Sequence, residues 1–161
     1  MLGAYCGAEG EERGQGQAIA ENIMEMSGLR TPVISIVIGE GGSGGALALC
    51  TADRVYMLEN AVYSVISPEG CASILWKDSA RVQDAADCLH ITAEDMVNFG
   101  VAERIIHEDF DNFPKMCKSL AKQLLTDFDE IYSLGSSGML GARYEHFRKI
   151  GIYEEKQTEE V

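Results

Sequence analysis

The chain has 161 residues, 46% of them hydrophobic, which is enough for one domain with a sizeable core. Its 13 basic and 26 acidic residues give a net charge of -13, which disfavours binding to nucleic acid or acidic membranes. No apolar run approaches the roughly 20 residues that span a bilayer, and the sequence has no signal-peptide pattern, so we expect a cytoplasmic protein.

The cysteines and histidines do not form metal or disulfide motifs. The five cysteines are odd in number and include no C-x-x-C pair, and the three histidines lack ligand spacing (Cys6, Cys50, Cys71, Cys88, Cys117; His90, His107, His146). We therefore expect no metal in this chain. Cys71 stands near a predicted helix start, where a thiol can become nucleophilic. No histidine is near it in sequence, so a small buried side chain is the favoured role.

A glycine-rich turn between a strand and a helix is the main candidate site. The β-branched run Pro32–Ile38 predicts a buried strand, and Ala46–Cys50 contains good helix formers before a further strand, Arg54–Leu58. Between them stands G-E-G-G-S-G-G-A-L, Gly39–Leu47. A strand that turns through glycines into a helix directs free backbone N–H groups and the positive end of the helix dipole to one place. The turn therefore predicts an anion site.

Four interpretations of this turn compete. A Walker A loop is excluded because Gly45 and Ala46 occupy the Lys and Ser/Thr positions. A Rossmann fingerprint matches at Gly39, Gly41 and Gly44, but the helix must end near residue 53, which is short for a crossover. An oxyanion hole built from the G-G-A backbone is the third interpretation, and a turn without a ligand is the fourth.

The same strand, turn and helix pattern occurs again. Ala61–Ile66 predicts a strand, a polar turn with Pro68 and Gly70 follows, and a helix is expected to begin at about Cys71. A third copy is expected at the N-terminus, where Gly3–Gly7 precedes a helix with an apolar stripe (Ile19, Ile23, Met26). Repeated units of this kind suggest a stack of turns that builds one pocket.

The second half of the chain is interpreted as scaffold. We expect a helix start at Thr92–Asp95, a stop at Gly100, and a strand over Val101–Ile106. A helix from about Pro114 carries an apolar stripe that suits core or subunit contact (Met116, Leu120, Leu124, Phe128). Composition then predicts a linker over Ser133–Gly138, a last helix over Met139–Ile150 and a frayed charged tail, Glu154–Val161.

Three segments resemble the α subunit of the bacterial acetyl-CoA carboxylase carboxyltransferase. They are G-A-Y-C-G with E-E-R-G-Q (Gly3–Gly7, Glu11–Gln15), V-I-G-E-G-G-S-G-G-A-L-A (Val37–Ala48) and Y-S-V-I-S-P-E-G-C-A-S-I-L-W-K (Tyr63–Lys77). The resemblance implies an α/β, crotonase-like (ClpP/crotonase) spiral of ββα turns, here partial and followed by C-terminal helices. It places the core in residues 1–132 and the linker, last helix and acidic tail in 133–161. The family's N-terminal half is absent from this sequence, so stand-alone activity is not expected.

The resemblance also implies a reaction and its partners. The family transfers a carboxyl group from biotin, carried on biotin carboxyl carrier protein, to acetyl-CoA to form malonyl-CoA. It implies an α2β2 hetero-oligomer in which the β subunit holds acetyl-CoA, and the acidic charge of this chain is likewise a poor match for coenzyme A phosphates. A Rossmann-type dinucleotide-binding domain and a catalytically silent subunit-binding fragment remain as alternatives.

We assign site roles to backbone groups. The N–H groups of Gly44 and Gly45 are expected to form the oxyanion hole. The biotin ring nitrogen is expected to take the proton from the acetyl methyl group, so no protein general base is needed. Further residues of the two turns are expected to contact biotin, as donors or as the wall of the pocket: Gly41, Gly42, Ala46, Gly70 and Cys71.

Overall fold

The computed structural model describes residues 7–151. Cys6, most of the expected N-terminal turn Gly3–Gly7, and the expected tail Glu154–Val161 lie outside the described residues. Within the described part, no helix is both long enough and apolar enough to cross a membrane.

The described chain contains two ββα units preceded by two helices. The helices are α1 (Ala8–Glu12) and α2 (Gln15–Gly28). The first unit consists of β1 (Ile34–Val37), β2 (Glu40–Gly42) and α3 (Ser43–Cys50). The second consists of β3 (Arg54–Leu58), β4 (Val62–Ser64) and α4 (Pro68–Trp76). Each unit thus contributes one strand to each of two sheets.

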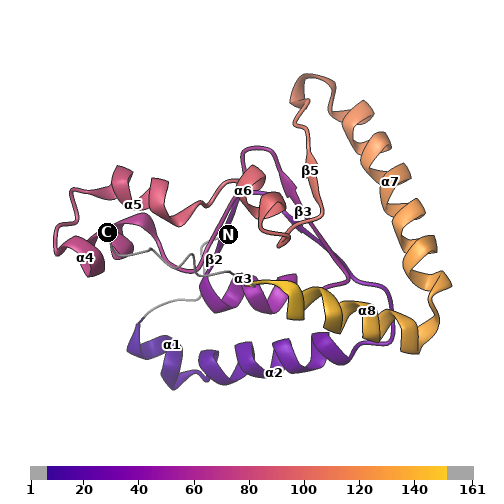
Figure 1. Ribbon diagram of the computed structural model, residues 1–161, viewed down its shortest axis with the longest axis horizontal. Helices are drawn as coiled ribbons and strands as arrows, with labels where there is room; N and C mark the ends of the chain where they lie inside the picture. Colours follow the sequence, from indigo (N-terminus) through magenta and orange to yellow (C-terminus); the bar gives the residue numbers. More distant parts are fainter. Residues whose placement is uncertain (1–6, 152–161) are drawn as a thin grey trace, which may run out of the picture.

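The remaining elements complete the first sheet and add the C-terminal helices. They are α5 (Val82–Leu89), α6 (Ala93–Asn98), β5 (Arg104–Ile106), the 3-10 turn η1 (Phe110–Asn112), α7 (Phe113–Ser133) and α8 (Gly135–Lys149). One sheet has the order β1-β3-β5 and the other pairs β2 with β4, and every strand pair is parallel. Figure 1 shows α2, α3 and α8 beneath the strands, with α7 diverging from them.

The core is centred on β3, the middle strand of the first sheet. Tyr56 and Met57 of this strand are each 1% exposed. Around them pack residues of β1, β5 and α6, and the first three positions of the expected α7 stripe, Met116, Leu120 and Leu124. A second small cluster holds α4 to α5 through Cys71, Ala72 and Ala85. The prediction that the α7 stripe is a packing surface is therefore confirmed at those three positions.

Side chains that are distant in sequence attach α7 to β3. The Asp127 carboxylate on α7 is 1% exposed and accepts hydrogen bonds from Tyr56, Arg54 and Gln123. Burial by itself raises the pKa of Asp127, but the hydrogen bonds from Tyr56 and Gln123 and the charge of Arg54 lower that pKa below its ordinary value. The folded structure therefore stabilises the ionised form of the Asp127 carboxylate.

Three predictions about local structure need correction, and one helix was not predicted. The segment 133–138 is not an irregular linker, because α8 begins at Gly135 directly after α7 ends at Ser133. Helix α4 begins at Pro68 rather than near Cys71, since Ser67 caps it and proline suits the first helical position. The glycine-rich residues Glu40–Gly42 form a strand by pairing with β4, and α5 was not anticipated.

Candidate functional site

The two predicted turns lie at the same end of the second sheet. Strands β2 and β4 are parallel neighbours, with Gly42 opposite Ser64. Helix α3 follows β2 at once, and α4 follows β4 after three residues. The sequence prediction that two strand-to-helix turns are brought side by side is therefore confirmed for the strand ends from which both helices start.

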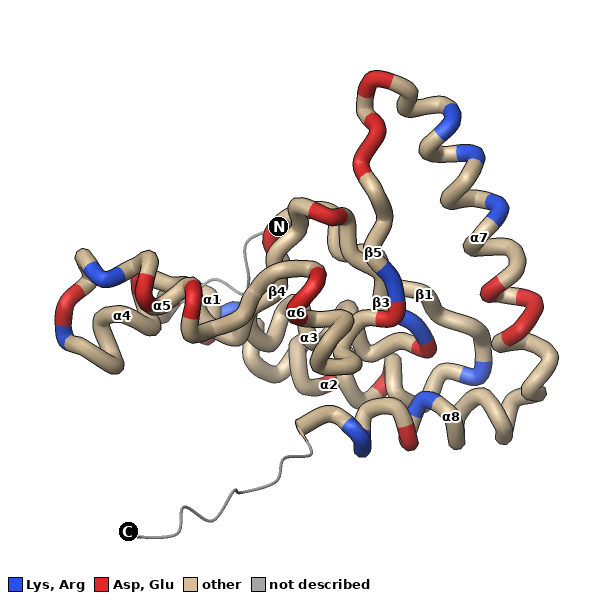
Figure 2. Tube along the Cα trace, turned by 45° about the horizontal axis from the view of Figure 1, so that its top comes forward, with Lys and Arg blue, Asp and Glu red and all other residues tan. Residues whose placement is uncertain are grey.

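The first turn of α3 has open backbone donors. Its N-cap is Gly42, and within residues 7–151 no side chain caps it. Ser43 has φ 55°, a left-handed conformation that is uncommon for a residue with a side chain. This sharp bend comes directly before Gly44 and Gly45, whose N–H groups belong to the turn that has no intrahelical acceptors. Figure 2 shows α3 free of charged residues, so no acidic side chain of α3 itself opposes an anion there.

Close packing fixes the backbone on either side of this turn. A Cβ atom on Gly44 would lie 3.3 Å from Cγ2 of Ile19, a residue of the predicted α2 stripe. A Cβ atom on Gly41 would lie 3.0 Å from Cδ2 of Tyr63 and 3.3 Å from Cγ1 of Val37. Burial raises the pKa of Tyr63 to about 12 and that of Cys50 to about 11, so both groups are neutral packing groups at neutral pH.

The first turn of α4 differs because the N–H groups of Gly70 and Cys71 already have acceptors. The Ser67 hydroxyl accepts a hydrogen bond from Gly70 N at 3.1 Å, and the Ser67 carbonyl accepts one from Cys71 N at 2.9 Å. Pro68 has no N–H. The N–H groups of Gly70 and Cys71, predicted as further donors or as part of the pocket wall, are therefore already bonded within α4. The Cys71 side chain is buried against Ala72 and Ala85, as expected for a small packing residue.

A cavity of about 350 Å³ adjoins α3. It is lined by the run Ser35–Gly42 together with Ala46, Leu49 and Cys50. Of the residues predicted to contact biotin, Gly41, Gly42 and Ala46 lie on this cavity, whereas Gly70 and Cys71 do not. Gly44 and Gly45, the predicted oxyanion donors, are not among the lining residues either, so the cavity gathers only Gly41, Gly42 and Ala46 of the predicted site residues.

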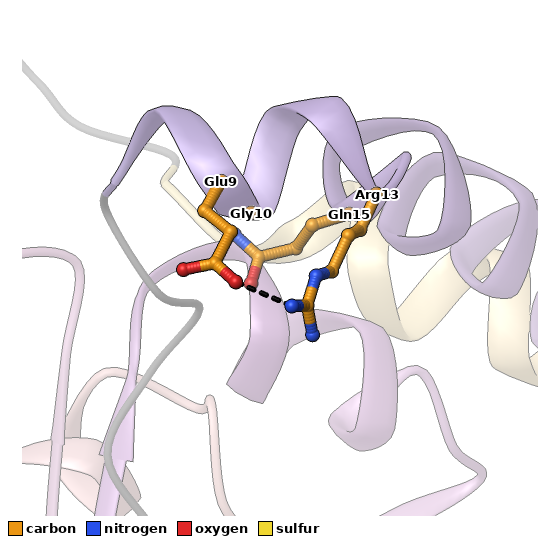
Figure 3. Close-up of a pocket in the computed structure, with 4 residues that line it drawn as sticks. All are labelled: Glu9, Gly10, Arg13 and Gln15. Atoms are coloured by element: carbon orange, nitrogen blue, oxygen red, sulfur yellow. Dashed lines mark hydrogen bonds and ion pairs between the residues drawn. The ribbon is translucent and has the colours of Figure 1, made fainter.

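A second hollow lies at the motif E-E-R-G-Q but contains none of the predicted site residues. It has a volume of about 360 Å³ and is lined by Glu9, Gly10, Arg13 and Gln15. Figure 3 shows the Arg13 guanidinium paired with the Glu9 carboxylate across it. Both side chains are largely exposed, which is typical of a weak surface ion pair. Elsewhere in residues 7–151, no group of His, Cys, Asp or Glu is arranged to hold a metal ion.

Sequence reasoning missed two residues that shape the site. Ser67 caps α4, and the Ser-Pro-Glu order was a readable signal for that cap. Ile19 packs over Gly44. The apolar stripe of α2 identifies the face of the helix that is packed, but it does not identify the residue on another element that Ile19 contacts.

Solved structures of known proteins share this fold. A Pseudomonas malonate decarboxylase hetero-tetramer has a TM-score of 0.64 at 19% identity, covering 85% of this chain and 56% of that one. Transcarboxylase 12S has a TM-score of 0.63 at 19% identity, covering 81% and 26%. An enoyl-CoA hydratase/isomerase from Marinobacter aquaeolei has a TM-score of 0.52 at 15% identity, covering 91% and 56%. These are crotonase-fold proteins, so the predicted fold class is confirmed.

Relatives with closer sequences are named as acetyl-coenzyme A carboxylase carboxyl transferase subunits. The α subunit of acetyl-coenzyme A carboxylase carboxyl transferase from Ruminiclostridium cellulolyticum is 53% identical over 150 residues, which are 93% of this chain and 58% of that protein. A protein from Clostridium tetani named as subunits beta/alpha is 49% identical over 158 residues, covering 96% of this chain and 28% of that protein. The chain thus spans little more than half the length of the separate α subunits.

These matches do not support the dinucleotide-binding alternative, and the segment Glu40–Gly42 pairs as a strand rather than forming a free phosphate loop. The family model for acetyl co-enzyme A carboxylase carboxyltransferase-like proteins matches residues 1–151. The chain belongs to that family.

Proposed function

We propose that this chain supplies the carboxybiotin side of an acetyl-CoA carboxyltransferase, with the backbone of α3 as its catalytic element. One observation carries the proposal. Of the two helices that start at the same sheet end, α4 is capped by the Ser67 side chain, whereas no side chain of residues 7–151 caps α3. The N–H groups of Gly44 and Gly45 therefore suit a developing negative charge.

The donor set fits the chemistry of a biotin ureido oxygen. Backbone N–H groups at a helix start donate hydrogen bonds and carry partial positive charge, which is what an oxyanion needs. Carboxybiotin, held on a carrier protein, would supply the carboxyl group that is transferred. Gly44 and Gly45 would donate to the oxygen that gains charge, while Gly41, Gly42 and Ala46 would line the approach. One such donor contributes about 3 kcal/mol to a transition state.

The remaining components of the reaction are proposed to come from partners. A net charge of -13 is a poor match for coenzyme A phosphates, so acetyl-CoA is assigned to a β subunit. The name of the Clostridium tetani relative, which joins beta and alpha in one protein, supports a partner of that kind. The proposed assembly is an α2β2 hetero-oligomer that also receives biotin carboxyl carrier protein. On this proposal the isolated chain transfers no carboxyl group.

The test uses a chimera in which residues 1–151 replace the matching segment of the Ruminiclostridium cellulolyticum α subunit, assembled with that organism's β subunit. We expect malonyl-CoA-dependent carboxylation of biotin by the chimera. Gly45→Val should lower kcat at least one hundredfold, because a β-branched side chain shifts the donors, while acetyl-CoA binding changes little.

Gly28→Ala is the matched control, because a Cβ atom at Gly28 meets nothing within 4 Å, and it should retain full activity. A Gly45→Val enzyme with near-normal carboxyl transfer would remove the oxyanion assignment. A chimera that assembles with the β subunit but transfers nothing would instead favour the silent, subunit-binding alternative.

A further inference from the structure

Helix α7 is apolar on two sides. Its inner side packs on the core through Met116, Leu120 and Leu124. An α-helix has about 3.6 residues per turn, so a stripe spaced by four residues drifts around the helix. Phe128, the fourth position of the predicted stripe, therefore lies on the outer side and is 37% exposed. The apolar residues of this side form what we call the outer stripe: Cys117, Ala121, Leu125, Phe128 and Tyr132.

The outer stripe is open to solvent in the single chain. Leu125 is 67% exposed and Tyr132 is 77% exposed. Cys117 and Ala121 are exposed as well. Figures 1 and 2 show α7 along one side of the molecule, with no other described element on its outer side. A surface helix of a single globular chain is usually apolar on one side only, so a second apolar stripe indicates contact with another molecule.

The charges of α7 are divided between its two halves. The first half, up to residue 122, has only basic charged residues, and the second half has only acidic ones: Lys115, Lys118 and Lys122, then Asp127, Asp129 and Glu130 (Figure 2). Lys118, Lys122 and Asp129 are exposed and form no ion pair with any of residues 7–151. Their spacing of i, i+4 and i+11 places all three on one flank of the outer stripe. The stripe thus has a basic end and an acidic end.

We infer that the outer stripe of α7 binds the outer stripe of a second copy of this chain, with the two helices antiparallel. A symmetric pair of this kind uses the same surface twice. Antiparallel pairing lays the basic half of each helix against the acidic half of the other, so Lys118 and Lys122 meet Asp129 of the second copy. Parallel pairing would instead set like charges against each other.

The apolar stripe supplies the affinity of this contact, and the charges set its direction. Exposed ion pairs contribute little binding energy, but unfavourable juxtaposition of like charges excludes a wrong arrangement. With 21 residues, α7 is about 30 Å long, so two such helices share a long apolar seam. None of the proposed donors or pocket residues belongs to α7, so the inference does not rest on the proposed function.

The experiment measures the association of the 161-residue chain by sedimentation equilibrium over a range of concentrations. We expect a monomer–dimer equilibrium. Leu125→Glu places a charge in the middle of the outer stripe and should raise the dissociation constant at least about tenfold. Because Leu125 is exposed, circular dichroism of this variant should match that of the wild type. Ile74→Glu makes the same change at a 69% exposed position on α4 and is the matched control, which should dimerise as the wild type does.

A charge reversal tests the direction of the pair. Lys118→Glu combined with Lys122→Glu sets acidic groups against Asp129 of the second copy and should weaken the dimer about tenfold. Adding Asp129→Lys restores opposite charges in the antiparallel arrangement and should recover most of the affinity. In a parallel pair, each reversed group would still face its own kind, so the third change would not restore binding.

A chain that stays monomeric, a dimer that tolerates Leu125→Glu, or a charge reversal without recovery would each overturn the inference. If Leu125→Glu left self-association unchanged but abolished binding to the Ruminiclostridium cellulolyticum β subunit, the outer stripe would belong to that partner, and the inference would again be overturned. None of these measurements depends on carboxyl transfer, so they separate this inference from the proposed activity.

Discussion

The guanidinium group of Arg143 on α8 holds the carboxylate of Asp53, 90 residues earlier in the chain, through Nε at 2.9 Å and Nη2 at 2.8 Å. The two side chains are 2% and 6% exposed. Arg143 Nη1 also donates to the carbonyls of Met26 and Leu29 at the end of α2. Asp53 in turn accepts a hydrogen bond from Val33 N at 2.8 Å. One buried ion pair therefore joins α8, α2 and the start of β1.

Replacing Arg143 should destabilise the protein strongly. Arg143→Met leaves the Asp53 carboxylate buried without its counter-charge, a situation that costs about 3–5 kcal/mol. Urea unfolding measures the free energy of unfolding. Arg148→Met, on the exposed side of the same helix, should change it by no more than about 0.5 kcal/mol. A loss below about 1 kcal/mol for Arg143→Met would contradict the structural role assigned here.

Stability should fall in acid partly through Asp127. Its pKa is lowered in the folded state, so the unfolded chain, with an aspartate pKa of about 3.9, binds the proton more readily. The contribution of this group is therefore fully present above about pH 4 and is lost as the pH falls through the lower folded pKa. Urea midpoints between pH 6 and pH 3 should drop less steeply for Asp127→Asn than for the wild type. Asp129→Asn, at an exposed position on α7, should follow the wild-type curve.

Two glycines of the site turn should respond oppositely to alanine. At Gly41 the new methyl group would meet Tyr63 and Val37 at 3.0 and 3.3 Å, and such overpacking costs about 1–3 kcal/mol. At Gly39 it would meet nothing within 4 Å, and Gly39→Ala should be neutral or stabilising by up to about 1 kcal/mol. Thermal and urea unfolding of the two variants side by side provide the comparison. Equal stability of both would show that β2 yields to the methyl group.

Cys71 should be dispensable for the chemistry. Its thiol packs in a small cluster and its N–H group is bonded to Ser67, so Cys71→Ala should retain carboxyl transfer within about tenfold in the assembled chimera. Ser67→Ala removes the cap of α4 and should cost about 0.5–2 kcal/mol of stability. A hundredfold loss of rate in a folded Cys71→Ala enzyme would identify the thiol as a functional group.

Hydrophobic periodicity and helix-capping residues predicted the elements that are determined by neighbouring residues in the sequence. The run Pro32–Ile38 contains β1, the stripe at Ile19, Ile23 and Met26 marks the packed face of α2, and Thr92 with Asp95 forms the expected capping box. The prediction of open donors at Gly44 and Gly45 agrees with α3, which no side chain caps in the part of the chain that the structure describes. Whether those donors act on biotin stays a prediction.

Elements and contacts that depend on residues distant in the sequence were not predicted. Gly135 and Gly138 predicted a linker, yet these exposed residues form the first turns of α8, the helix whose buried residues are Met139 and Arg143. Glu40–Gly42 is a strand only because Val62–Ser64 lies beside it. The bonds from Arg54 and Tyr56 to Asp127 join residues 73 and 71 positions apart, which no periodicity can indicate.

The Arg143–Asp53 pair also sets an order of events during synthesis. Asp53 and β1 leave the ribosome well before Arg143, and until α8 is made the Asp53 carboxylate has no cation to bury with it. The hydrogen bonds between Val33 and Asp53 can form earlier, because they involve no atom of Arg143. The carboxylate that accepts from Val33 N is therefore neutralised only when the last helix docks, so the joint between β1 and the end of α2 gains its counter-charge at the end of synthesis.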